Sequence, residues 1–186
     1  VLTQYGVDVV RWYLISNSSP WDDMKFSFEG LKETRNKIFG TLENVYRFFS
    51  AYANIDGFKL ADFDSQNIHF SELDHWLISR MNSTLHEVNE KLTNYDCTTA
   101  ARAIEKFIDE LSNWYIRRSR ERFWAGKKMT GSSEKSMNDK LAAYIVTRDA
   151  LINLSIMMSP FAPFFSDWLF RLLNSKANES VHLQNY

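Results

Sequence analysis

Apolar residues recur at intervals of three and four along most of the chain, which is the spacing of the buried face of an α-helix. This spacing predicts a helix from Ser27, whose hydroxyl can cap it, to about Ala53. A second helix is predicted after Ser71, with Asp74 in its first turn. The two apolar stripes consist of Leu31, Ile38, Leu42, Val45, Phe49 and Tyr52 in the first helix, and of Leu73, Trp76, Leu77, Met81, Leu85, Val88 and Leu92 in the second.

The same pattern continues in the second half of the chain. After a break at Asn94-Tyr95-Asp96, a third helix is predicted from about Cys97 to Phe123. A polar loop over 125–138 separates it from a fourth helix over about 139–158. This fourth helix is apolar around much of its circumference, which favours a central place in a bundle.

Proline defines the last predicted element. The sequence Ser159-Pro160-Phe161-Ala162-Pro163 interrupts the fourth helix, because proline lacks an amide hydrogen. A short helix over 164–173 follows, with Pro163 near its first turn. The first fifteen residues have β-branched side chains that would also suit a strand, and we interpret them as helical.

Composition supports this helical pattern. Only six Gly and three Pro occur in 186 residues, of which 45% are hydrophobic, so long uninterrupted helices and a real core are expected. The predicted fold class is all-α, a helical bundle of four to five main helices. The chain starts without Met, and we expect it to be a piece of a longer protein.

Charge is informative only when it is examined locally. Lys and Arg number 22 against 23 Asp and Glu, so no strong overall field attracts nucleic acid or acidic lipid. Segment 113–128, however, contains six basic residues and one acidic residue. Any binding of a polyanion is therefore expected to be local.

The basic segment includes the end of the third predicted helix, where residues 113–124 read NWYIRRSRERFW. At 100° per residue, the apolar stripe that reaches Tyr115 continues through Arg118 and Arg122. The core face of this helix is therefore predicted to become cationic at its C-terminal end.

Two interpretations of the arginines remain open at this point. In the first, the guanidinium groups bind phosphates while Trp114, Tyr115 and Trp124 stack on unpaired bases. In the second, the arginines cap the C-terminus of the helix and bridge to acids on neighbouring helices, and the aromatic side chains pack inside the bundle. The acids available for such bridges include Glu72, Asp74, Glu105 and Asp109.

Other candidate chemistry is weak. Asp22-Asp23 has no nearby His or Cys in the sequence and is typical of a turn, and the four histidines lack the spacing of a metal site. The single Cys97 excludes an intramolecular disulfide and fits a reducing compartment. No phosphate-binding glycine motif is present, and no apolar run approaches the roughly 20 residues of a membrane span.

Residues 112–124, preceded by Tyr95-Asp96 and by Ala100-Ala101-Arg102-Ala103-Ile104, resemble the anticodon-binding helix bundle of bacterial-type isoleucyl-tRNA synthetases. Further segments resemble this family in the same order: YGVDVVRWYL at 5–14, PWDDMKF at 20–26, LDHWLISR at 73–80, MSPFAPF at 158–164 and SVHL at 180–183. The last two are shared with valyl and leucyl relatives, whereas the arginine-rich string is more specific to isoleucine.

The resemblance implies a stem-contact segment over 1–26, following a catalytic domain, and an anticodon-binding bundle over 27–186. It implies a cytoplasmic parent ligase that activates isoleucine with ATP and Mg²⁺ in a Rossmann domain, whose signature His-x-Gly-His is missing from this chain. The expected partners are the anticodon arm of isoleucine tRNA and the remaining domains of the synthetase, with no membrane. No cofactor, metal or catalytic residue is expected within the chain itself.

The resemblance also favours RNA contact over the structural interpretation of the arginines. The expected RNA-binding residues are Arg117, Arg118, Arg120, Arg122, Trp124, Lys127 and Lys128. The string KKMTGS at 127–132 is similar to the Lys-Met-Ser-Lys-Ser loop of the family but lies on the wrong side of the bundle, so only backbone contact is expected of it. The alternatives are a helical scaffold that binds protein, or the equivalent domain of a valyl- or leucyl-type synthetase.

Overall fold

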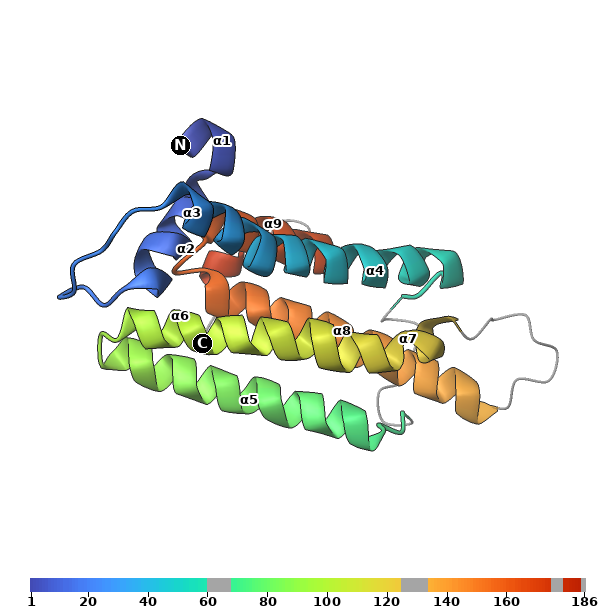
Figure 1. The fold of residues 1–186 in the computed structure, drawn as a ribbon. Helices are drawn as coiled ribbons and strands as arrows, with labels where there is room; N and C mark the ends of the chain where they lie inside the picture. Colours follow the sequence, from blue (N-terminus) through green and yellow to red (C-terminus); the bar gives the residue numbers. More distant parts are fainter. Residues whose placement is uncertain (60–67, 125–133, 175–178, 185–186) are drawn as a thin grey trace.

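The structure, a computed structural model, describes residues 1–59, 68–124, 134–174 and 179–184. Every regular element in these ranges is helical, which confirms the all-α prediction. In Figure 1 the long helices lie side by side along one direction, with α1 projecting at one end. The elements are α1 (Leu2–Tyr5), α2 (Val7–Asn17), α3 (Phe28–Thr34), η1 (Arg35–Gly40), α4 (Thr41–Asp56), α5 (Glu72–Thr93), α6 (Cys97–Asp109), η4 (Glu110–Ile116), α7 (Arg117–Trp124), α8 (Glu134–Met158), α9 (Pro163–Leu173) and η5 (Val181–Leu183).

The helix starts occur where the capping residues predict them. The Ser27 hydroxyl accepts a hydrogen bond from the Gly30 amide at the start of α3. At α5, Ser71 and Asp74 form a reciprocal capping box. Helix α4 ends at Asp56 and is capped by Gly57, which has a left-handed φ of 63° that glycine adopts at little cost. These local signals explain why the predicted ends of the helices are close to the observed ones.

Two of the predicted helices contain a turn of π-helix. The elements α3, η1 and α4 follow one another without a break, as do α6, η4 and α7. A π-turn closes hydrogen bonds over five residues instead of four and therefore accommodates one extra residue. The residues that follow such a turn are rotated relative to those that precede it, which matters for the arginines of α7.

The core is shared by all the long helices and by α2. Trp12 of α2 is fully buried, and its ring lies 6.1 Å from Phe39 and 5.5 Å from Phe161. At the other end of the bundle, Phe123 and Tyr144 are buried and meet edge to face at 5.0 Å. Residues 1–26 and the bundle thus share one core, and the boundary proposed at residue 26 stays a prediction.

The N-terminal residues are helical, as predicted, and α2 is anchored by polar side chains. The Asp8 carboxylate accepts a hydrogen bond of 2.6 Å from the Phe165 amide at the start of α9. The Arg11 guanidinium donates to the carbonyl oxygens of Pro160 and Phe161, both at 3.1 Å. Helix α2 therefore supplies a cap for α9 and holds the proline-containing turn before it.

Helix α8 differs from the prediction at its start. It begins at Glu134, so the predicted loop over 125–138 is too long, and residues 125–133 lie outside the described ranges. Its segment Met137–Met158 is long and apolar enough to span a membrane by composition, which the sequence analysis had excluded. Because 67% of this apolar stretch is buried within the bundle, its apolar character is accounted for by the core.

Candidate RNA-binding surface

The π-turn in η4 changes which residues of α7 face the core. The expectation that the buried stripe runs through Arg118 and Arg122 is wrong by one residue, since Ser119 and Phe123 are the buried positions, each 0% exposed. The extra residue accommodated by the π-turn explains this shift, because it rotates α7 by about one residue relative to α6. Arg118 is exposed as a consequence.

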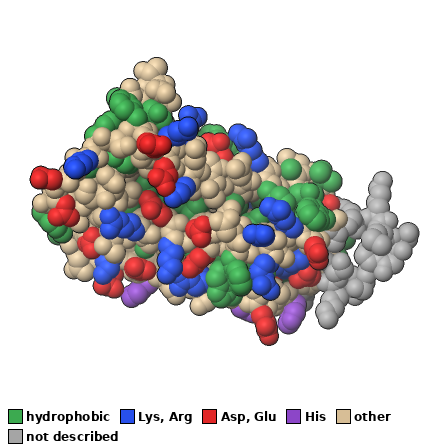
Figure 2. Space-filling view, in the orientation of Figure 1, with side chains coloured by type: hydrophobic (Ala, Val, Ile, Leu, Met, Phe, Trp, Pro, Cys, Tyr) green, Lys and Arg blue, Asp and Glu red, His purple; other side chains and the backbone are tan. Residues whose placement is uncertain are grey.

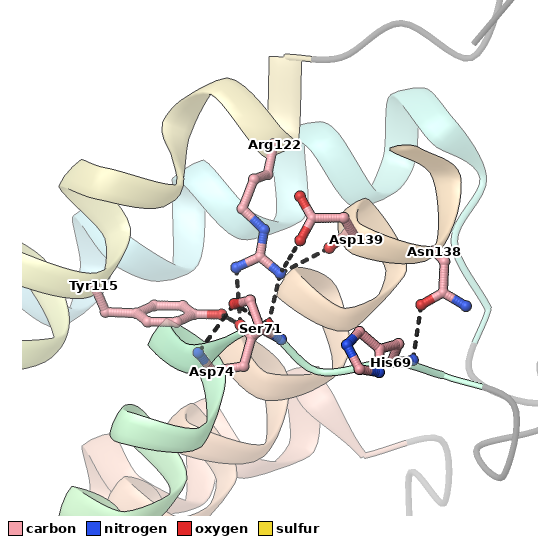
Figure 3. Close-up of polar contacts among 7 residues, drawn as sticks. All are labelled: His69, Ser71, Asp74, Tyr115, Arg122, Asn138 and Asp139. Carbon is pink, nitrogen blue, oxygen red and sulfur yellow. Dashed lines mark hydrogen bonds and ion pairs between the residues drawn. The ribbon is translucent and has the colours of Figure 1, made fainter. Parts of the chain in front are cut away.

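Arg122 lies at the edge of the core and is held by acids of two other helices (Figure 3). Its Nη1 and Nη2 atoms donate to the two carboxylate oxygens of Asp74 on α5, at 2.8 and 2.7 Å. Nη2 also donates to the backbone oxygen of Asp139 on α8 at 2.8 Å and lies 3.0 Å from its carboxylate. Arg122 therefore joins α5, α7 and α8.

The Asp74 carboxylate accepts further hydrogen bonds from Tyr115 at 2.6 Å and from the amide and hydroxyl of Ser71 at 2.8 and 2.7 Å. Burial by itself would raise the pKa of Asp74, but the hydrogen bonds from Arg122, Tyr115 and Ser71 outweigh it and lower that pKa. Burial and the neighbouring carboxylate raise the pKa of Tyr115, so its hydroxyl stays protonated as a donor. We call Ser71, Asp74, Tyr115, Arg122 and Asp139 the Asp74 network.

The Asp74 network separates Arg122 from the other predicted RNA-binding residues. The Arg122 side chain is only 12% exposed, and Asp74 is 0% exposed. Binding RNA through this guanidinium would require breaking a bidentate buried pair, which is costly. The geometry of Arg122 matches the second interpretation, in which an arginine bridges helices. Asp74 is one of the acids that this interpretation proposed as partners.

A second buried polar group fixes the same end of the bundle and was missed by sequence reasoning. Lys140 of α8 is 5% exposed and lies 2.5 Å from the carboxylate of Asp56 at the end of α4, which also accepts a 2.5 Å hydrogen bond from Tyr144. In the sequence, Tyr144 belongs to the apolar stretch of α8 and does not stand out as polar. The signal for this contact is that Lys140 and Tyr144, both with polar groups, lie one turn apart on the same helix. Helix α8 is thus tied to α4 as well as to α5 and α7.

The remaining arginines of α7 point outward. Arg117, Arg118 and Arg120 are exposed, and within the described part of the chain none of them forms an ion pair. Trp124 is 56% exposed and ends the helix. In Figure 2, blue side chains lie beside green ones over the region that Figure 1 labels α7. We call Arg117, Arg118, Arg120 and Trp124 the α7 surface.

The α7 surface has two edges, which are defined by the helices beside it. Phe123 packs against Phe48 and Tyr52 of α4, at 5.0 and 6.3 Å between ring centroids. At 100° per residue, Arg120 lies on the side of α7 nearest Phe123, whereas Arg118 lies nearest Arg122 and α5. Arg120 and Arg118 are therefore at opposite edges of one cationic face.

The α5 edge carries a stack of Arg118 on Trp114, and the ring of Trp76 lies against Trp114 at an angle of 58°. The Arg118 guanidinium lies over the ring of Trp114, 4.8 Å from its centroid, and Trp114 in turn lies 6.3 Å from Trp76 of α5. Trp114 is 49% exposed, so about half of its side chain packs on neighbouring residues and the other half faces solvent. Neither predicted role, stacking on RNA or packing in the core, fits it alone. Trp76 was assigned to the apolar stripe of α5 and is partly buried against the core, as predicted. Its contact with Trp114 was missed because one sequence gives no register between helices.

Two acids near Arg118 are bonded to other side chains, while Glu121 of α7 is exposed. Glu110 accepts two hydrogen bonds from Arg80, at 2.9 and 3.1 Å, and Asp109 accepts one of 2.6 Å from the Asn113 amide. Arg118 forms no ion pair among the residues that the structure describes, and Arg117, Arg118 and Arg120 outnumber the one exposed acid of α7, Glu121. The α7 surface therefore retains a local excess of positive charge.

The sequence also named candidate residues outside α7. Lys127 and Lys128 lie outside the described ranges. Asp22 and Asp23 are exposed in an irregular segment, and Cys97 is a free thiol at the start of α6. In the described ranges no group of three His, Cys, Asp or Glu side chains is arranged to hold a metal ion.

Residues 74–186 match the family described as the anticodon-binding domain of tRNA ligase. The chain is similar to the isoleucine–tRNA ligase of Porphyromonas gingivalis, with 47% identity over 98% of the chain and 15% of the relative. It is also similar to that of Bacteroides thetaiotaomicron, with 40% identity over the whole chain and 16% of the relative. The chain thus spans about one sixth of the length of the curated relatives it matches.

Solved structures with low sequence identity share the fold. Methionyl-tRNA synthetase of Mycobacterium tuberculosis, in complex with methionyl-adenylate, aligns with a TM-score of 0.78 at 19% identity, over 97% of this chain and 34% of that one. A leucyl-type enzyme of Agrobacterium radiobacter, in a ternary complex with tRNA, aligns with a TM-score of 0.61 at 18% identity, over 97% of this chain and 19% of that one.

Proposed function

Because this chain belongs to the anticodon-binding domains of tRNA ligases, we propose that it holds the anticodon arm of an isoleucine tRNA for a longer isoleucine–tRNA ligase. The ATP- and Mg²⁺-dependent aminoacylation is assigned to a Rossmann domain elsewhere in that enzyme, which we propose to be cytoplasmic. In this chain, catalysis has no assigned residue, and the role is to bind and orient the RNA.

The single observation that carries the proposal is the α7 surface. Arg117, Arg118 and Arg120 face solvent without ion pairs in the described ranges, next to the exposed ring of Trp124. Guanidinium groups bind phosphates with paired hydrogen bonds, and an exposed indole can stack on an unpaired base. Phosphate contacts fix the position of the RNA, and base contacts supply discrimination between tRNAs.

The buried networks give this surface a rigid support. The Asp74 network holds α7 against α5 and α8, and the Lys140–Asp56 pair holds α8 against α4. A surface on helices whose positions are fixed in this way loses little conformational entropy on binding. Arg122 is accordingly proposed to support the surface without contacting RNA.

The alternative of a protein-binding scaffold is less well supported. It expects the arginines to be paired with acids, and this describes Arg122 but not Arg117, Arg118 or Arg120 in the described part of the chain. A valyl- or leucyl-type domain is also less well supported, because the curated relatives cited above are isoleucine–tRNA ligases.

Titration of the 186-residue chain with a fluorescent hairpin of the isoleucine anticodon arm tests the proposal. We expect affinity to fall steeply with salt, and Arg117→Ala with Arg118→Ala to weaken binding by about tenfold or more. The matched control is Arg171→Ala, since Arg171 is a half-exposed arginine of α9 paired with Asp167. Equal binding by the double variant and the unmodified chain would refute the assignment.

A further inference from the structure

The stack at the α5 edge of the α7 surface has a geometry that suits one task. Arg118 lies 4.8 Å above the Trp114 ring, and Trp76 supports Trp114 from α5 at 6.3 Å. A guanidinium lying over an indole is held by cation–π attraction, and its N–H groups still point outward from its edge. Such an arginine is oriented before a ligand arrives.

The neighbouring charges indicate what this oriented group would bind. Glu110 is engaged by Arg80, and Asp74 by Arg122, so the nearest buried or half-buried acids are neutralised by other arginines. Arg118 forms no ion pair in the described ranges, and Arg117 and Arg120 outweigh the exposed Glu121 in the field around it. The complementary partner is a compact anion with acceptor oxygens.

We infer that Trp114 is a positioning residue that orients Arg118 to bind a phosphate group of the RNA backbone. The inference rests on the proposed function and deepens it. Trp114 acts through Arg118, and the α5 edge contacts the backbone. The opposite edge, with Arg120 and Trp124, remains available for the unpaired bases.

A double-mutant cycle on the same hairpin distinguishes positioning from direct contact. We expect Arg118→Ala to weaken binding by about five- to tenfold and to lower the slope of log K against log salt by about 0.7 to 0.9, which corresponds to one lost phosphate contact. Trp114→Ala should weaken binding by about threefold and leave the slope unchanged, since the charge is still present. The double variant should bind like Arg118→Ala alone.

Two conservative variants separate the stack from general folding effects. Trp114→Phe retains an aromatic face and should restore most of the affinity, whereas Arg118→Lys keeps the charge and the slope but loses the planar guanidinium group. In the Arg118→Lys background, Trp114→Ala should have little further effect. Thermal unfolding of each variant verifies that the bundle is intact.

The possible outcomes are distinct. If the losses from Trp114→Ala and Arg118→Ala multiply, Trp114 contacts the RNA independently and the inference is overturned. The inference is also overturned if Arg118→Ala leaves the salt slope unchanged, or if Arg171→Ala has the same effect on the slope. Should the unmodified chain fail to bind any RNA hairpin, the proposed function itself fails and the inference fails with it.

Discussion

Arg118 and Arg122 lie one turn apart on α7 and have opposite surroundings. Arg122 is 12% exposed and pairs with Asp74 and Asp139, whereas Arg118 is exposed and lies over Trp114. The difference arises from their partners: α5 and α8 place carboxylates opposite Arg122, whereas Arg118 lies over Trp114, one turn earlier in the same continuous helix. The role of an arginine in a basic run therefore depends on whether another helix places a carboxylate opposite it.

The largest expected effect is on stability, at the buried arginine. Arg122→Ala leaves the Asp74 charge buried without its partner and should lower the free energy of unfolding by about 3–5 kcal/mol. Arg118→Ala should change it by less than about 0.5 kcal/mol, because Arg118 is exposed. Urea unfolding followed by circular dichroism measures both. Similar losses from the two substitutions would remove the contrast between them.

The second effect depends on pH. Asp74→Asn should lower the free energy of unfolding by about 3 kcal/mol at pH 7. The pKa of Asp74 is lowered on folding, so its contribution is complete above the ordinary value of about 3.9 and is lost as pH falls through the folded value. Unfolding curves of the two proteins should converge on acidification. Burial raises the pKa of Asp8 and Asp149, but this is common to both proteins and cancels in the difference.

The third effect should be seen in binding and not in stability. Trp124→Ala should weaken binding of the anticodon-arm hairpin by about five- to tenfold, the loss expected for a base that stacks on an indole. Because Trp124 is 56% exposed, its removal should shift the unfolding midpoint very little. Phe123→Ala is the informative contrast, since the neighbouring ring is fully buried and its loss should destabilise the bundle. Unchanged affinity for Trp124→Ala would assign base stacking to another residue.

The smallest effect tests the outer part of the Asp74 network. Ser71→Ala removes the hydroxyl that caps α5 and donates to Asp74, and should lower the free energy of unfolding by about 1 kcal/mol. The Arg122 pair is retained, so hairpin binding should be unchanged. A loss of several kcal/mol, or an altered affinity, would mean that Ser71 has a larger part in holding α7 than its contacts indicate.

Sequence reasoning performed best where the signal is local. The caps at Ser27 and Ser71, the break at Asn94-Tyr95-Asp96 and the interruption at Pro160 and Pro163 were all predicted, because each depends on residues within a few positions. The start of α8 was placed late, since polar residues 134–138 continue into the helix. Local rules cannot distinguish a polar first turn from a loop.

The candidate site was predictable as a segment but not residue by residue. Composition and family resemblance located the arginine run, whereas the separation of Arg122 from the other arginines depends on Asp74, 48 positions earlier in the chain. A constant 100° per residue also placed Arg118 in the core, because the π-turn of η4 has no recognised signature in one sequence. Long-range partners and small changes of helical phase were thus the missing information.

The π-turn of η4 sets the phase of α7. Converting the wide turn to an ordinary α-helical one at constant length would rotate everything after it by about 100°. Arg118 and Arg122 would then move to the positions now held by Ser119 and Phe123, inside the core. Deleting one residue within Glu110–Ile116 would instead remove the extra residue and keep Ser119 and Phe123 in the core, so a single-codon deletion should be tolerated better in this turn than in the α-helical turns on either side of it.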